Sequence, residues 1–129
     1  MRLLLDTHVA IWALTSPELL SDQVRDLIAN PANDVHVSAV SIWEIAIKFA
    51  LGKKSAPPFS GEQALAYFRE AGYVMLAVTA EHAASVEDLP PLHADPLDRL
   101  LVAQALSEPL RLVTQDRKIT AYSDTIITW

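Results

Sequence analysis

Short apolar runs of the kind that form β-strands alternate along this chain with segments that have helical spacing. The strand-like runs cover residues 3–5, 35–37, 73–78, 112–114 and 126–129. Strands that are separated by helices are joined by right-handed crossovers, and such crossovers build a parallel sheet with helices on both faces. We therefore expect the α/β fold class, in a single domain that spans residues 1–129.

Helical patterns fill the intervals between these runs. The expected helices cover residues 8–14, 17–30, 41–51, 61–71, 80–86, 96–106 and 118–122. The most regular is the helix over 41–51, where apolar residues from Ile42 to Phe49 repeat at i, i+3, i+4 and i+7. Gly52 follows it where a left-handed cap belongs, and Thr7 is the expected cap of the first helix.

Composition limits the classes of function. No apolar run approaches the roughly 20 residues that a membrane-spanning helix needs, and the N-terminal run is too short for a signal peptide. The chain has no cysteine, which removes disulfides, thiolate metal sites and cysteine nucleophiles. We therefore expect a soluble, cytoplasmic protein without a membrane partner, in which any metal is held by oxygen or imidazole ligands.

The distribution of charge matters more than its total. A net charge of −6 argues against binding nucleic acid over the whole surface, because phosphate binding depends on neutralising cations. Several basic residues nevertheless lie close in sequence to acids that could form a site, so the charge pattern has two interpretations: a positive rim around an acidic centre, or an ordinary mixed surface. The rim residues that could contact a polyanionic substrate are Lys48, Lys53, Arg99 and Arg117.

Two of the strand-like runs end on an aspartate. Asp6 follows Leu3-Leu4-Leu5, and Asp116 closely follows the run Leu112-Val113-Thr114. The carboxyl ends of parallel strands meet at one edge of the sheet, which is where ligands bind in open α/β folds. The two carboxylates are therefore expected to lie close together.

Two further acids stand near expected helix starts, and each has a structural alternative. Glu44 fits a capping box with Ser41, with Lys48 one turn later as an ion partner. Asp98 lies in the first turn of a helix that Asp95 caps, where the helix dipole favours a carboxylate. Both helices are nevertheless expected to begin at the same edge of the sheet, so Glu44 and Asp98 should join Asp6 and Asp116.

Four acids from separate segments suggest a metal site. Carboxylates packed together repel one another unless a cation lies among them, and hard oxygen ligands suit Mg²⁺ or Mn²⁺. Such a site activates water and stabilises the leaving oxygen in phosphodiester cleavage. The predicted chemistry is therefore metal-dependent hydrolysis of a polyanion.

Four segments of the chain resemble the signature segments of a PIN domain and, more narrowly, of a VapC-type ribonuclease toxin of a bacterial type II toxin–antitoxin pair. They are Leu4-Leu5-Asp6-Thr7-His8, residues 38–48, residues 95–105 and Leu112-Val113-Thr114-Gln115-Asp116. The resemblance spans the chain in the right order and implies a three-layer α/β/α fold with a central parallel sheet of four to five strands. One departure is Gln104, where the family pattern usually has alanine.

The resemblance also implies roles for the individual residues. The catalytic acids would be Asp6, Glu44, Asp98 and Asp116. The main ligands of Mg²⁺ or Mn²⁺ would be Asp6 and Asp98, and Asp116 would hold a second ion or position water. Thr114 would orient the last acid. Asp95 is either a helix cap alone or an extension of the site.

The resemblance implies partners as well. They are an RNA substrate of the tRNA or ribosomal RNA class, a VapB-like antitoxin and a second copy of the chain in a homodimer.

A catalytically silent PIN-like module that binds RNA or protein remains the main alternative, although such a module would not need all four acids. A phosphoacceptor receiver or a haloacid-dehalogenase-like phosphatase fits less well, because the latter wants an acid where this chain has His8. The four histidines have no spacing typical of metal ligands, so we expect none of them to bind the metal.

Overall fold

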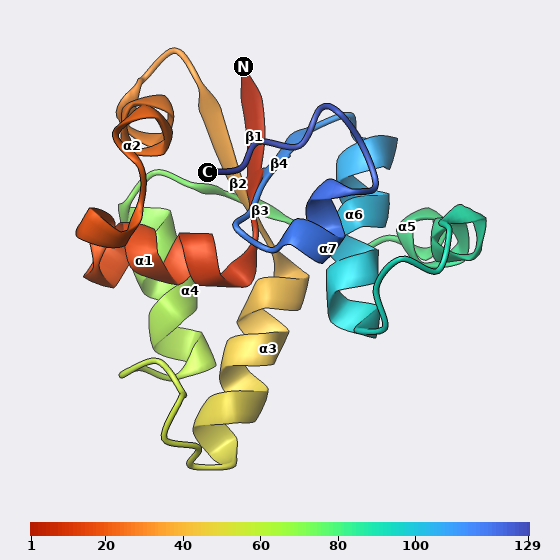
Figure 1. The fold of residues 1–129 in the computed structure, drawn as a ribbon. Helices are drawn as coiled ribbons and strands as arrows, with labels where there is room; N and C mark the ends of the chain where they lie inside the picture. Colours follow the sequence, from red (N-terminus) through yellow and green to blue (C-terminus); the bar gives the residue numbers. More distant parts are fainter.

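A four-stranded parallel sheet forms the centre of the computed structural model, which describes residues 1–129. Its strands lie in the order β3-β2-β1-β4, and Figure 1 shows helices on both sides of them. The strands are β1 (Arg2–Leu5), β2 (Asp34–Ser38), β3 (Val74–Leu76) and β4 (Arg111–Val113). The parallel pairing confirms the predicted α/β class and the expected three-layer architecture.

Helices fill the segments between the strands, close to the predicted positions. No helix combines the length and the apolar character that crossing a membrane requires. The α-helices are α1 (Thr7–Thr15), α2 (Asp22–Ala29), α3 (Ala39–Ala50), α4 (Gly61–Glu70), α5 (Ala80–Ser85), α6 (Pro96–Ser107) and α7 (Arg117–Thr120), and two short 3₁₀ helices cover Pro17–Leu19 and Val86–Asp88.

Each face of the sheet has its own hydrophobic core, because alternate residues of a strand point to opposite faces. Leu3 and Leu5 of β1 belong to the core that α1, α2 and α4 cover. Leu4, between them, belongs to the second core, which α6 and β4 supply and α7 extends. All three leucines are fully buried, so β1 is covered on both faces, as expected for a central parallel strand.

Two predicted elements are wrong in extent. The helix expected over 17–30 is interrupted: a 3₁₀ turn covers Pro17–Leu19, and α2 starts afresh after Ser21, whose hydroxyl accepts from the backbone N–H of Val24. The strand expected over 126–129 is reduced to one bridge between Ile127 and Val113. The apolar run predicted that this segment pairs with the sheet but not how short the pairing is.

Two predicted helix caps are also wrong. Asp6 caps α1 in place of Thr7, whose hydroxyl instead donates to Ser41. Ser38 caps α3 in place of Ser41, because the chain turns from β2 into the helix without an intervening loop. The capping box expected between Ser41 and Glu44 therefore does not form, and the side chain of Glu44 is left for another use.

Gln104 marks a polar contact inside the second layer of helices. Its side chain is fully buried, accepts a hydrogen bond from Ser38 and donates one to the carbonyl of Ala77, at 3.2 Å. Buried amides need such partners. The departure from the usual alanine thus ties α6 to the end of β2, beside the start of α3.

The contact between α3 and α4 provides a test of the fold. A Cβ added to Gly61 would lie 2.8 Å from the Cβ of Ala46. Gly61→Ala should therefore destabilise the protein by about 1–3 kcal/mol through overpacking. In denaturant unfolding, Ala46→Gly alone should cost about 1 kcal/mol through helix propensity. The double variant should be no less stable than Ala46→Gly, and strictly additive losses would contradict this packing.

Candidate active site

Asp6 is the most deeply buried of the predicted acids. Its first carboxylate oxygen accepts from the backbone N–H of Val9 at 2.9 Å, and its second accepts from the hydroxyl of Thr114. Burial raises the pKa of Asp6, and the hydrogen bonds from Thr114 and Val9 oppose that rise. The side chain is thus fixed in orientation at the carboxyl end of β1.

Thr114 connects two of the acids. While its hydroxyl donates to Asp6, the same oxygen accepts from the backbone N–H of Asp116 at 3.0 Å. Asp116 in turn caps α7 by accepting from the backbone N–H of Lys118 at 2.9 Å. One buried hydroxyl therefore holds the ends of β1 and β4 in register at the site.

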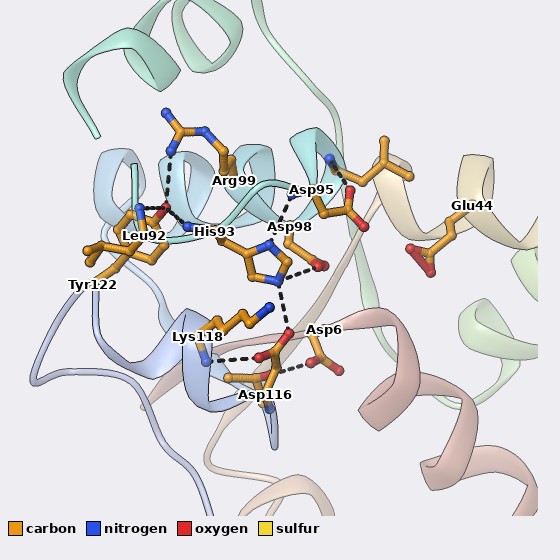
Figure 2. A network of polar contacts seen from close by, with 12 residues as sticks. Asp6, Glu44, Leu92, His93, Asp95, Asp98, Arg99, Asp116, Lys118 and Tyr122 are labelled. Atoms are coloured by element: carbon orange, nitrogen blue, oxygen red, sulfur yellow. Dashed lines mark hydrogen bonds and ion pairs between the residues drawn. The ribbon is translucent and has the colours of Figure 1, made fainter. Parts of the chain in front are cut away.

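The imidazole of His93 lies between Asp98 and Asp116. Its Nε2 atom is 3.1 Å from Oδ2 of Asp98 and 3.0 Å from Oδ2 of Asp116, with which it is hydrogen-bonded. One ligand atom from each of these three residues lies within 4.8 Å of the others. Figure 2 shows the carboxylates of Asp6, Asp98 and Asp116 around this ring. The sequence analysis did not predict the position of His93, because no spacing pattern marks it.

The electrostatic environments of Asp98 and Asp116 differ. Burial, followed by the negative charge of Asp95, raises the pKa of Asp98 to about 7, and Glu44 and Asp6 contribute in the same direction. Burial also acts on Asp116, but hydrogen bonds from His93 and from the Lys118 backbone outweigh it and lower its pKa. Of these two carboxylates, Asp98 is therefore the one whose negative charge the protein compensates less.

Glu44 faces the same site from α3 and lies in the second turn of the helix, because α3 begins at Ala39 rather than at the expected Ser41. Its Oε2 atom is buried and accepts no hydrogen bond, and the ammonium group of Lys48 lies 3.6 Å away, beyond hydrogen-bonding distance. A buried carboxylate oxygen without a donor is costly unless another group binds it. Its effect on the pKa of Asp98 shows that the two carboxylates are electrostatic neighbours.

Asp95 caps α6, as its structural interpretation predicted. Its Oδ1 atom accepts from the backbone N–H of Leu97 at 2.9 Å, and Pro96 occupies the first turn. The carboxylate also raises the pKa of Asp98, so its charge reaches the site. Asp95 therefore combines a helix cap with an electrostatic contribution.

These residues fit a divalent cation. The donors are carboxylates, the ligand type that Mg²⁺ and Mn²⁺ prefer. Two observations indicate an unmet need for positive charge: the raised pKa of Asp98 and the unpartnered buried oxygen of Glu44. Asp98 and Asp116 offer ligand atoms within 4.8 Å of each other, whereas both oxygens of Asp6 already accept protein hydrogen bonds. A carboxylate oxygen has further lone pairs, so these bonds leave Asp6 able to bind a metal.

The basic residues of the predicted rim have different surroundings. Lys53 and Arg117 are exposed, and Lys48 pairs with Glu44. The guanidinium of Arg99 donates instead to the carbonyl of Val86, to the carbonyls of Leu89 and Pro90 in the proline-rich loop of residues 89–92, and to the hydroxyl of Tyr122. These bonds direct Arg99 into the protein, so the geometry favours a structural role over the predicted contact with RNA.

Comparisons with known proteins agree with this architecture. The PIN domain family model matches residues 3–124. Ribonuclease VapC22 of Mycobacterium tuberculosis (strain ATCC 25618 / H37Rv) is 34% identical over 128 residues, which cover 92% of this chain and 90% of that protein. The chain therefore belongs to the PIN domain family, as its four segments predicted, and it resembles the VapC-type members of that family.

Solved structures show the same fold at lower identity. VapBC2 from Rickettsia felis, bound to a DNA fragment from its promoter, matches with a TM-score of 0.69 and 19% identity, over 100% of this chain and 98% of that one. VapBC-5 from Mycobacterium tuberculosis matches with a TM-score of 0.63 and 21% identity, over 99% and 98% of the two chains. VapBC-5 is a member of the VapBC family of toxin–antitoxin systems. At these identities the two matches show a shared fold.

The raised pKa of Asp98 predicts how stability depends on pH. Because the folded protein holds a proton on Asp98 between about pH 4 and 7 that the unfolded chain releases, this residue makes stability fall as pH rises through that window. Asp116 titrates below this range and does not offset the effect. In urea unfolding with EDTA, Asp98→Asn should gain stability relative to wild type at pH 8 but not at pH 4. An equal difference between the two proteins at both pH values would contradict the assignment.

Proposed function

We propose that this protein is a divalent-metal-dependent endoribonuclease and the toxin component of a VapBC-type toxin–antitoxin pair. The observation that carries the proposal is the convergence of Asp6, Glu44, Asp98 and Asp116 from four separate segments at one edge of a parallel sheet. Two of these carboxylates have a raised pKa, which is typical of residues in catalytic sites. The 34% identity to a protein named as a ribonuclease supports the same reaction class.

Asp98, Asp116 and Asp6 would hold Mg²⁺ or Mn²⁺. When bound, the ion supplies an activated water nucleophile and stabilises the leaving oxygen of a cleaved phosphodiester. The free Oε2 atom of Glu44 is suited to accept a hydrogen bond from water near the ion. Thr114 keeps Asp6 and Asp116 oriented, so these two ligands are pre-organised before substrate arrives.

The substrate is proposed to be RNA of the tRNA or ribosomal RNA class, which is consistent with a cytoplasmic location. Lys53 and Arg117 are exposed and free to approach phosphates, and Lys48 lies beside Glu44 at the site. Cation neutralisation of the acids would remove the repulsion that an RNA backbone otherwise meets. The negative net charge favours contact through this rim rather than over the whole surface.

A VapB-like antitoxin and a homodimer complete the proposed assembly. The proteins from Rickettsia felis and Salmonella typhimurium with the same fold were solved as VapBC bound to DNA. In a pair of this type the antitoxin keeps the ribonuclease inactive until the antitoxin is degraded. The partner of this chain would then be encoded in a neighbouring short reading frame.

One observation favours a catalytically silent PIN-like module. Asp6, Asp95 and Asp116 each cap a helix, so their presence has a structural explanation. Asp98 and Glu44 have no such task, since neither carboxylate accepts a backbone hydrogen bond at a helix start. Asp98 is therefore the residue that best separates the enzyme from the silent module.

Asp98→Asn should abolish Mg²⁺- or Mn²⁺-dependent cleavage of a tRNA or total-RNA pool. The loss should exceed about 100-fold, since replacing even the partners behind metal ligands costs roughly 10–100-fold. The fold should persist, because asparagine has nearly the same shape. Asp26→Asn, on the exposed surface of α2, is the matched control and should cleave like wild type. An EDTA control defines the metal-independent background.

Equal cleavage by wild type and Asp98→Asn would rule out this mechanism, and no cleavage of any RNA by wild type would favour the silent module.

In the same RNA-cleavage assay, Lys53→Gln combined with Arg117→Gln should raise KM with little change in kcat. Arg25→Gln, which removes an exposed cation on α2, should leave both values unchanged. Expression of wild type alone should arrest bacterial growth, whereas Asp98→Asn should not.

A further inference from the structure

The side chain of His93 is fixed by contacts on both of its ring nitrogens. Nδ1 lies 3.0 Å from the backbone nitrogen of Asp95, which donates to it, and Nε2 is hydrogen-bonded to Asp116 at 3.0 Å. The ring is almost buried, with 11% of the side chain exposed. The orientation of the imidazole therefore follows from the protein's own hydrogen bonds (Figure 2).

These contacts determine the tautomer. A backbone N–H only donates, so Nδ1 must present a lone pair, and the proton of the neutral ring then lies on Nε2. Nε2–H faces Asp116 and has an oxygen of Asp98 3.1 Å away, both suitable acceptors.

The tautomer also bears on metal binding. A histidine binds a metal through a nitrogen lone pair, but Nε2, the nitrogen that faces the acids, carries the proton. Although this atom lies within 4.8 Å of potential ligand atoms of Asp98 and Asp116, it is a hydrogen-bond donor in this arrangement. His93 therefore acts on the carboxylates rather than as a ligand beside them.

The loop that carries His93 is anchored independently of the acids. The hydroxyl of Tyr122 accepts from the backbone N–H groups of Leu92 and His93, at 3.2 and 3.0 Å. Arg99 donates to the same hydroxyl at 3.1 Å and to the carbonyl of Pro90 at 3.0 Å. The proline-rich connection is thus held by α6 and by the segment after α7, and it presents the ring at a fixed position.

We propose that His93 is a positioning residue that holds the carboxylates of Asp98 and Asp116 side by side through its Nε2–H donor. Asp98 comes from α6 and Asp116 from the end of β4, and their charges repel. A fixed donor between them offsets that repulsion and keeps their oxygens in a common orientation toward a cation. The inference rests on the proposed metal-dependent function, because its consequence is the affinity for Mg²⁺.

Two substitutions separate the functions of the two ring nitrogens. His93→Gln places an amide N–H near the position of Nε2 and loses the acceptor for Asp95. His93→Asn keeps an acceptor near the position of Nδ1 and loses the donor toward the acids. The proposal predicts that Mg²⁺ affinity, measured by calorimetry on the full chain, stays near the wild-type value in His93→Gln and falls about 10-fold or more in His93→Asn. The reverse order, or equal loss in both variants, would overturn it.

The tautomer provides a readout that does not depend on activity or on the variants. Long-range ¹H–¹⁵N correlation spectra of wild type should show the proton of His93 on Nε2, before and after addition of Mg²⁺. A proton on Nδ1 in either state would overturn the positioning role and indicate a nitrogen ligand. In that case His93→Gln should also weaken Mn²⁺ binding more than Mg²⁺ binding, because imidazole favours transition metals.

The two proposals can fail separately. If wild type cleaves no RNA while the tautomer and the order of Mg²⁺ affinities are as predicted, the ribonuclease function fails and the role of His93 stands. If wild type cleaves RNA but the spectra show Nδ1–H, the role of His93 fails and the ribonuclease stands. A wild-type protein that binds no Mg²⁺ would overturn the positioning role as well as the metal site.

Discussion

The parallel pairing of β1 with both of its neighbours is the constraint on which the site depends. Its register sets Leu5 opposite Val37 and opposite Val113, so Asp6, Ser38 and Thr114 follow at the same edge of the sheet. Each of these three then makes a defined contact: Asp6 caps α1, Ser38 caps α3, and Thr114 donates to Asp6. The same short segments therefore specify the sheet, the directions of two helices and the position of the acids.

The negative charge that this pairing concentrates is only partly compensated by the protein. Asp6 and Asp116 accept hydrogen bonds from backbone amides, from Thr114 and from His93, whereas Glu44 keeps a buried oxygen without a donor. Asp98 has a raised pKa for a related reason, since burial and neighbouring acids act on it together. Hydrogen bonds thus fix the carboxylates of Asp6 and Asp116, whereas Asp98 and Glu44 are short of compensating positive charge. A cation that binds reversibly would supply that charge.

The sequence predicted the features that follow from local rules. Apolar runs that end on Asp6 and near Asp116 located the edge of the sheet, and Asp95-Pro96 located the start of α6. His93 escaped prediction because its position depends on Tyr122, 29 residues away, and on a proline-rich loop without periodicity. A usable signal was its place two residues before Asp95, where Nδ1 can accept the backbone N–H. The caps of α1 and α3 were misplaced because strand and helix adjoin without a loop, so the last residue before the helix acts as the cap.

The central claim is that these acids form a site for a divalent cation, and linked proton release tests it most directly. Because the pKa of Asp98 is about 7, a substantial fraction of its carboxyl is protonated near neutral pH, and binding of Mg²⁺ must displace that proton. Calorimetric titration of Mg²⁺ at pH 7, in two buffers with different ionisation enthalpies, measures the release. The account predicts proton release in wild type and its loss in Asp98→Asn. Absence of Mg²⁺ and Mn²⁺ binding at millimolar concentration, or binding without proton release, would contradict it.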